Sequence, residues 1–213
     1  MTTTGVLGAG RFSARRDQGV PDPVGSPRID VEAAELAVRD LLVALGRDPD
    51  SEHMAATPRR AAGAFAELLT GEPFDLTTFP NDEDYDELVF VRDIPFRSLC
   101  EHHLLPFHGV AHVGYLPADR ILGLSKLARV VGRFASDLQS QERLTKQVAD
   151  WLDLQLRPLG VGVVIEAEHL CMCLRGVKAM GTRTVTSALH GQVRHDARSR
   201  QEFLALATSA PRP

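Results

Sequence analysis

The sequence contains little cysteine, with three residues among 213, and it has no strong imbalance of charge, since the formal net charge is −4. Because the first residues lack the basic start and apolar stretch of a secretory signal, three cysteines do not predict a disulfide framework. The small net charge gives no global reason to bind nucleic acid or a membrane surface. No apolar run approaches the roughly 18 residues of a spanning helix. These absences predict a cytoplasmic protein with reduced thiols that binds neither nucleic acid nor a membrane.

The first 71 residues have the pattern of an arm followed by a pair of helices. Residues 1–29 are rich in Gly, Pro, Ser and Thr and show no sustained period, which predicts a disordered N-terminal arm. Residues 30–71 carry two helical patterns and predict an N-terminal helical segment. The residues placed to cap and to end these helices are Asp30 and Gly46 for the first, and Thr57 and Gly71 for the second.

Beyond residue 71 the hydrophobic period changes several times, which predicts one domain over residues 72–207 and a short tail at 208–213. Residues 72–86 are acidic and turn-rich, and they predict a loop. Strand patterns follow at 87–100, 109–117, 160–176 and 182–191, and helix patterns at 124–136, 142–157 and 196–207. The order of these patterns predicts an α+β fold with an antiparallel sheet: helices, a strand pair, a helix pair, another strand pair and a helix.

The stretch SLCEHHLLPFHG, residues 98–109, places four polar, metal-capable side chains in a row: Cys100, Glu101, His102 and His103. Cys100 and His103 stand at a C-x-x-H spacing, which lets one tight turn present a thiolate and an imidazole to one tetrahedral ion. Two ligands are too few for such an ion, so a third must come from elsewhere in the chain.

The strand pattern near residue 170 supplies candidates for the third ligand. Because side chains alternate along a strand, one face is expected to carry Val163, Ile165, Ala167, His169, Cys171, Cys173 and Arg175. This face changes from aliphatic to imidazole, thiol and guanidinium, as expected where a strand leaves a core and enters a site. A lone cysteine is more often a small buried hydrophobe than a ligand, and this is the interpretation we keep for Cys173.

A Cys-x-x-His pair with a distant cysteine gives three protein ligands, the number found in catalytic zinc sites that keep a position open for water. His102 and His169 then remain unbound nearby, and unbound imidazoles suit general acid–base catalysis. The residue pattern therefore predicts a zinc hydrolase site and leaves the substrate open.

Five blocks, taken in order, resemble GTP cyclohydrolase I of the zinc-dependent type IA, from about Asp30 to about Leu206: SLCEHHLLPFHGVAHVGYLP, ILGLSKLARVV, QERLTKQVADWL, GVGVVIEAEHLCMCLRGV and TVTS. The resemblance implies conversion of GTP to 7,8-dihydroneopterin triphosphate and formate, the first step of tetrahydrofolate and pterin biosynthesis. It makes residues 72–207 the catalytic domain and implies the tunnelling fold, in which antiparallel sheets of several subunits join into a barrel with flanking helices. It also implies a homodecamer with sites between subunits.

The resemblance further implies roles for single residues. The implied zinc ligands are Cys100, His103 and Cys171; the acid–base residues are His102 and His169; the triphosphate contacts are Ser125, Lys126, Arg129 and Arg175; and the guanine contacts are Gln141 and Glu142. Ser125 is also expected to cap its helix, where N-terminal amides attract anions. Only a carboxylate accepts two hydrogen bonds from the N1–H and 2-amino edge of guanine, an edge that adenine lacks. Glu142 is therefore expected to select GTP.

Alternatives remain open at this stage. Asp137, Ser140 and His190 depart from the family pattern, and they fit a paralogue that feeds a specialised pterin or 7-deazapurine pathway as well as a housekeeping enzyme. A related tunnelling-fold enzyme, such as a pyruvoyltetrahydropterin synthase, is similar in fold alone and holds zinc by three His, so the cysteines count against it. A non-catalytic zinc-stabilised binding module would need a closed four-ligand site, with Cys173 as the fourth ligand.

Overall fold

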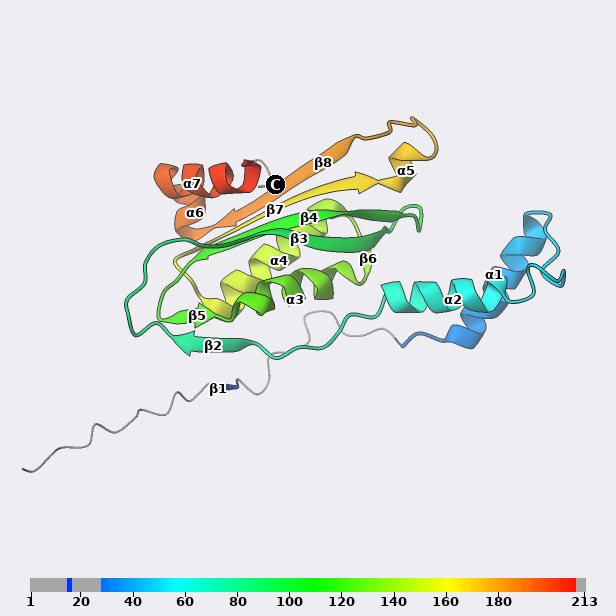
Figure 1. Cartoon of the computed structure of the whole chain (residues 1–213), viewed down its shortest axis with the longest axis horizontal. Coiled ribbons are helices and arrows are strands. Elements are labelled where there is room, and N and C mark those ends of the chain that lie inside the picture. Colours follow the sequence, from blue (N-terminus) through cyan, green and yellow to red (C-terminus); the bar gives the residue numbers. More distant parts are fainter. Residues whose placement is uncertain (1–14, 17–27, 210–213) are drawn as a thin grey trace, which may run out of the picture.

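In this computed structural model, which describes residues 15–16 and 28–209, a sheet with helices on both faces carries a pair of helices at one end (Figure 1). The arm predicted for residues 1–29 lies largely outside the described residues, as do residues 210–213 of the predicted tail. Within the arm, β1 (Arg15–Arg16) pairs with a later strand. None of the helices in the described ranges has the length and apolarity needed to span a lipid bilayer.

The helical pair is confirmed, with one cap displaced. In α1 (Val31–Ala44) the Asp30 side chain accepts a hydrogen bond from the Ala33 N–H at 2.9 Å, as predicted. In α2 (Thr57–Leu68) the N-cap is Ala56, and Thr57 is the first helical residue instead of the cap. The displacement is tolerated because N–H groups of the first turn need no helical partner, so a proline fits its second position as well as its first.

The predicted antiparallel sheet is also confirmed. Its four main strands, β3 (Val89–Cys100), β4 (Pro106–Leu116), β7 (Gly160–His169) and β8 (Arg183–His190), pair antiparallel in that order. The two-residue strand β6 (Leu138–Gln139) runs parallel to the end of β3. A second sheet joins β1, β2 (Thr77–Pro80) and β5 (Arg120–Leu122). The loop predicted at 72–86 thus contains β2, which is too short to show an alternating pattern.

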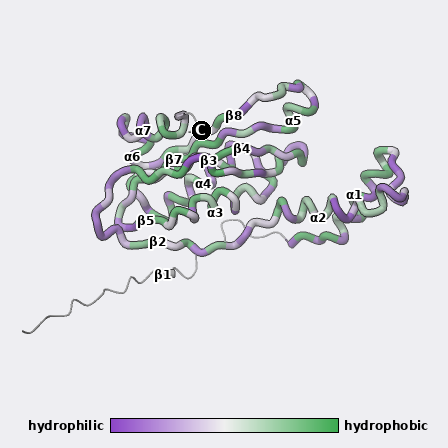
Figure 2. The backbone as a smooth tube through the Cα atoms, in the orientation of Figure 1, coloured by the Kyte–Doolittle hydropathy of each residue, from purple (hydrophilic) through white to green (hydrophobic). Residues whose placement is uncertain are grey.

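Helices cover both faces of the main sheet (Figure 1). On one face lie α3 (Leu124–Ala135) and α4 (Gln141–Leu156), and on the other lie α6 (Gly191–His195) and α7 (Ala197–Thr208). Phe203 of α7 is fully buried against Gly162 of β7, where an added Cβ would meet its ring at 2.6 Å. Apolar segments run through the sheet and its helices, whereas the link between β2 and β3 is hydrophilic (Figure 2).

The strand predicted for residues 160–176 is shorter than expected. Val163, Ile165 and Ala167 are fully buried, which confirms the predicted inward face. However, β7 ends at His169 and leads into a helical turn, α5 (Leu170–Cys173). The two cysteines therefore do not share a strand face with His169. The apolar letters LCMCL have no clear period, so they fit a strand and a helical turn equally well.

Candidate functional site

The predicted zinc ligands come together between two elements that are distant in sequence. The turn between β3 and β4 carries Cys100 and His103, and it is held by the Leu104 N–H, which donates to the Cys100 carbonyl at 2.8 Å. Cys171 reaches the same place from α5. The ligand atoms of Cys100, His103 and Cys171 all lie within 4.8 Å of one another. This group is the arrangement that the sequence predicted, although a helical turn and not a strand presents its third member.

A cavity of about 230 Å³ contains the group. Its lining residues come from the β3–β4 turn, β6, the start of α4, the end of β7, α5 and the start of β8: Cys100, His102, His103, Gln139, Ser140, Gln141, Glu142, His169, Cys171, Met172 and Thr184. Both predicted acid–base residues and both predicted guanine contacts are therefore at one cavity with the possible metal ligands.

The two neighbouring imidazoles of the turn differ in their surroundings. The Nδ1 atoms of His102 and His103 each lie 3.8 Å from Cys100 Sγ. Within the described residues, however, only His103 belongs to the group that also includes Cys171. The His102 side chain is 67% exposed, and its Nε2 lies 3.8 Å from Glu101 Oε1. The geometry therefore favours His103 as the ligand and leaves His102 available at the mouth of the cavity.

Cys173, the fourth-ligand candidate of the alternative module, is buried outside the group. It is 2% exposed, and its Sγ donates a hydrogen bond to the Ala179 carbonyl at 3.4 Å. In the part of the chain that the structure describes, the metal-capable group has three members and does not include Cys173. A three-ligand group fits a site with an open coordination position.

His169 is held at the end of β7 by two contacts. Its ring stacks on Phe107, with centroids 4.7 Å apart and planes at 2°. Its Nε2 lies 2.7 Å from Oε1 of Gln141. Burial lowers the pKa of His169 from its ordinary value, and the Glu142 carboxylate opposes this shift. The ring is therefore fixed in orientation and favours the neutral form.

The start of α4 supplies the residues predicted to bind guanine. Ser140 is the N-cap of α4, and its hydroxyl accepts a hydrogen bond from the Arg143 N–H at 3.3 Å, so this departure from the family pattern supports the helix. Glu142 is exposed at the cavity. Gln141 is 2% exposed and its side-chain amide is hydrogen-bonded within the chain. A guanine contact through that amide would have to replace one of these bonds.

Sequence reasoning did not find the ion pair that ties the turn to α4. Glu101 Oε2 lies 2.7 Å from Arg143 Nη2, and Arg143 Nε donates to Gln139 Oε1 at 3.0 Å. Glu101 and Arg143 are far apart in sequence, and each looks like an ordinary surface charge. Only the docking of α4 against the turn reveals the pair.

The predicted triphosphate contacts are not brought to this cavity. Ser125 is the second residue of α3, whose N-cap is Gly123, so the predicted cap is wrong by two residues and no side chain caps this helix. Arg129 lines a different cavity of about 430 Å³. Arg175 is exposed just beyond α5, where its charge opposes the rise in the pKa of Cys171 that burial causes. Lys126 is not among the residues that line the metal cavity.

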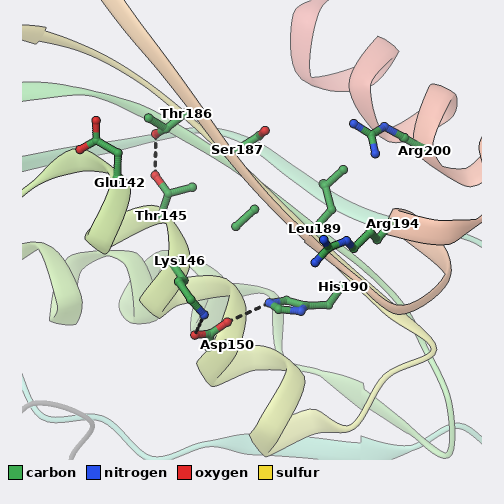
Figure 3. Close-up of a pocket in the computed structure, with 11 residues that line it drawn as sticks. Glu142, Thr145, Lys146, Asp150, Thr186, Ser187, Leu189, His190, Arg194 and Arg200 are labelled. Carbon is green, nitrogen blue, oxygen red and sulfur yellow. Dashed lines mark hydrogen bonds and ion pairs between the residues drawn. The ribbon is translucent and has the colours of Figure 1, made fainter.

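A third cavity, of about 530 Å³, lies between α4 and β8 and reaches α6 and α7 (Figure 3). His190, another departure from the family pattern, places Nε2 at 2.9 Å from Asp150 Oδ1, and Lys146 pairs with the second oxygen of Asp150. Arg194 and Arg200 also line the cavity (Figure 3), and neither has an ion pair among residues 28–209. This end of β8 is therefore basic.

Comparison with known proteins gives consistent matches. Residues 34–208 match the family model described as GTP cyclohydrolase I. The chain is 54% identical over 188 residues to GTP cyclohydrolase 1 of Mycobacterium leprae, with 84% of this chain and 92% of that protein covered. It is 52% identical over 186 residues to GTP cyclohydrolase 1 of Mycolicibacterium gilvum, with 85% and 92% covered. A solved apo structure of the archaeosine synthase QueF-Like aligns with a TM-score of 0.39 and 17% identity, over 49% of this chain and 93% of that chain.

Proposed function

The chain belongs to the GTP cyclohydrolase I family, a family of hydrolases, and on that premise we propose that its metal cavity opens the imidazole ring of GTP at C8. The products proposed are formate and 7,8-dihydroneopterin triphosphate, and the expected setting is the cytoplasm, at the first step of tetrahydrofolate and pterin biosynthesis. The observation that carries the proposal is the group of Cys100, His103 and Cys171 at one cavity with two further imidazoles.

The donor set fits zinc. Two thiols and one imidazole match the Cys₂His pattern of catalytic zinc sites, which leave one position for water. Burial raises the pKa of the Cys171 thiol, and the neighbouring Cys100 raises it further. A divalent cation would offset the repulsion between the two ionised thiols and lower their pKa, because coordinated thiols lose their protons. When bound, zinc would supply a water of lowered pKa next to the substrate.

The side chains around the group are proposed to transfer protons, recognise guanine and bind the triphosphate. His169 has one orientation and favours the neutral form, so it is suited to exchange a proton with a ring nitrogen of the purine. His102, exposed at the mouth of the cavity, is the second proton carrier. The Glu142 carboxylate accepts the N1–H and 2-amino hydrogens of guanine. Ser125, Lys126, Arg129 and Arg175 bind the triphosphate.

We also propose a homodecamer with sites between subunits. The outer edge of β8 and most of that of β3 have no strand partner within the described residues, since β6 pairs only with Leu99 and Cys100. Strand directions alternate from β3 to β8, so β3 of a second copy would continue the antiparallel sheet. The exposed acidic residues 82–87, which precede β3, would then approach the basic end of β8 at Arg194 and Arg200. Light scattering should give the mass of ten chains.

The function is tested by incubating zinc-loaded protein with GTP and measuring formate together with the fluorescence of the oxidised pterin. Both should appear in equal amounts, because one C8 leaves for every pyrazine ring closed. ATP should not react, since adenine would leave the Glu142 carboxylate unpaired, and guanosine should react much more slowly than GTP. Formate without a pterin would indicate a different branch of purine chemistry. If the zinc-loaded protein forms neither product, this result contradicts the proposal and favours a binding module.

A further inference from the structure

The side-chain amide of Gln141 is surrounded by acceptors on one side and by a single imidazole on the other. Its Nε2 lies 3.0 Å from the Ile165 carbonyl, 2.9 Å from the Thr184 carbonyl and 3.1 Å from Thr186 Oγ1. Its Oε1 lies 2.7 Å from His169 Nε2. The whole side chain is buried. The orientation of this amide therefore decides which groups around it must donate.

The Thr186 hydroxyl acts as a hydrogen-bond acceptor toward the side chain of Gln141. Thr145 Oγ1 donates its only hydrogen to the Gln141 carbonyl at 2.7 Å. The contact of 2.6 Å between the hydroxyls of Thr145 and Thr186 must then use the hydrogen of Thr186. Having spent its hydrogen, Thr186 Oγ1 is left to accept from Gln141 Nε2.

A flipped amide does not fit this environment. It would turn Oε1 toward two carbonyl oxygens and a hydroxyl oxygen whose hydrogen is already used, so that these oxygens would face one another with no hydrogen between them. Because buried polar groups are nearly always hydrogen-bonded, the amide hydrogens of Gln141 must face these acceptors. Oε1 must then face His169, where an amide oxygen can only accept. The hydrogen of that bond consequently sits on His169 Nε2.

We propose that Gln141 is a positioning residue that holds neutral His169 in the tautomer protonated at Nε2, so that Nδ1 exchanges the proton during turnover. Within the described residues, Nδ1 of His169 has no hydrogen-bond partner, which leaves it available to substrate. The part about turnover rests on the proposed function, whereas the tautomer rests on the hydrogen-bond network alone. The role differs from a direct guanine contact, because Gln141 would act on the substrate through His169.

The tautomer is measured by ¹⁵N NMR of the ring nitrogens in zinc-loaded full-length protein labelled at histidine, at about pH 8.5, above the ordinary imidazole pKa. Loss of one signal pair in His169→Gln assigns the ring. We expect a protonated Nε2 and an unprotonated Nδ1. A protonated Nδ1 in the wild-type protein would overturn the proposal, and this result requires no variant of Gln141.

Gln141→Leu removes the acceptor for His169 at similar volume. We expect a mixture of tautomers and a kcat at least about tenfold lower, less than the roughly 10²–10⁴-fold expected for loss of the imidazole itself, with KM for GTP changed by less than about twofold. Thr186→Val is the matched control, because it weakens the same network and leaves the bond to His169. It should keep the Nε2 tautomer.

The outcomes separate the two proposals. An unchanged tautomer and a raised KM in Gln141→Leu would overturn the positioning role in favour of a guanine contact. A wild-type protein with the Nε2 tautomer that releases no formate from GTP would contradict the proposed function and leave the geometry of Gln141 and His169 intact.

Discussion

The metal half and the triphosphate half of the proposed site differ in how much of each one chain assembles. Cys100, His103 and Cys171 lie within 4.8 Å of one another, at a cavity that also includes both acid–base candidates. The triphosphate residues are dispersed: Arg129 lines another cavity, and Lys126 lies at the start of α3. One chain thus brings together the residues of the proposed metal site, but it does not bring together the residues proposed to bind the triphosphate.

The difference has a structural origin. The metal half lies where the start of β4 meets the end of β7, and backbone hydrogen bonds in the turn and in α5 fix the backbone that carries its side chains. Among the proposed triphosphate residues, Ser125, Arg129 and Arg175 are exposed and Lys126 is half-buried, and no hydrogen bond or ion pair within residues 28–209 orients their side chains toward the cavity. The backbone of one chain therefore brings the possible metal ligands together, whereas the proposed triphosphate site would need residues from a second copy.

The largest effect is expected from Cys171→Ser. Two remaining ligands are too few for a tetrahedral ion, and a serine hydroxyl does not replace a thiolate. Bound zinc after gel filtration and formate release from GTP should both fall to background. Circular dichroism should remain that of the wild-type protein, because Cys171 is only partly buried. Retention of zinc would mean that the metal half is assembled differently.

A smaller effect is expected from His169→Ala, which tests whether chemistry and coordination are separate within the metal half. The kcat should fall by about 10²–10⁴-fold, the usual contribution of a general acid–base group, while zinc content stays at the wild-type level. His102→Ala should behave in the same way. Loss of zinc in His102→Ala would instead identify this imidazole as a ligand.

Much of the fold could be predicted from the sequence, because its period and caps are local properties. The strand segments and the cap at Asp30 follow from neighbouring residues alone. The errors lie where the local pattern is ambiguous. The residues of α5, which were predicted to continue the strand past His169, are apolar without a clear period. The strand β2 is only four residues long.

The site could be predicted only in part. The C-x-x-H spacing predicts Cys100 and His103 as ligands, because both residues lie in one turn. The bond from His169 to Gln141 and the ion pair from Glu101 to Arg143 have no such spacing, since they depend on how α4 docks beside the strands. Tertiary contacts of this kind are not encoded in any short segment.

Mixed oligomers test directly whether the two halves come from different chains. Lys126→Ala damages the triphosphate half, and Cys171→Ser damages the metal half. If each site takes its halves from two subunits of a symmetric assembly, co-expression of the two variants in equal amounts, assayed at a GTP concentration at which neither variant alone reacts, should restore roughly a quarter of wild-type activity. Each variant alone is the control. Restored activity near zero would place both halves in the same chain.

The smallest effect is expected from Cys173→Ser, the matched control for Cys171→Ser. Cys173 is 2% exposed and donates a hydrogen bond to the Ala179 carbonyl at 3.4 Å, a bond that a serine hydroxyl also makes. Burial and the Glu168 carboxylate raise the pKa of this thiol, and within the described residues it lies outside the group of possible metal ligands. Zinc content and kcat should remain within about twofold of wild type, and the free energy of unfolding should fall by about 1 kcal/mol. Loss of zinc in this variant would make Cys173 a fourth ligand, close the open coordination position, and favour a zinc-stabilised module over an enzyme.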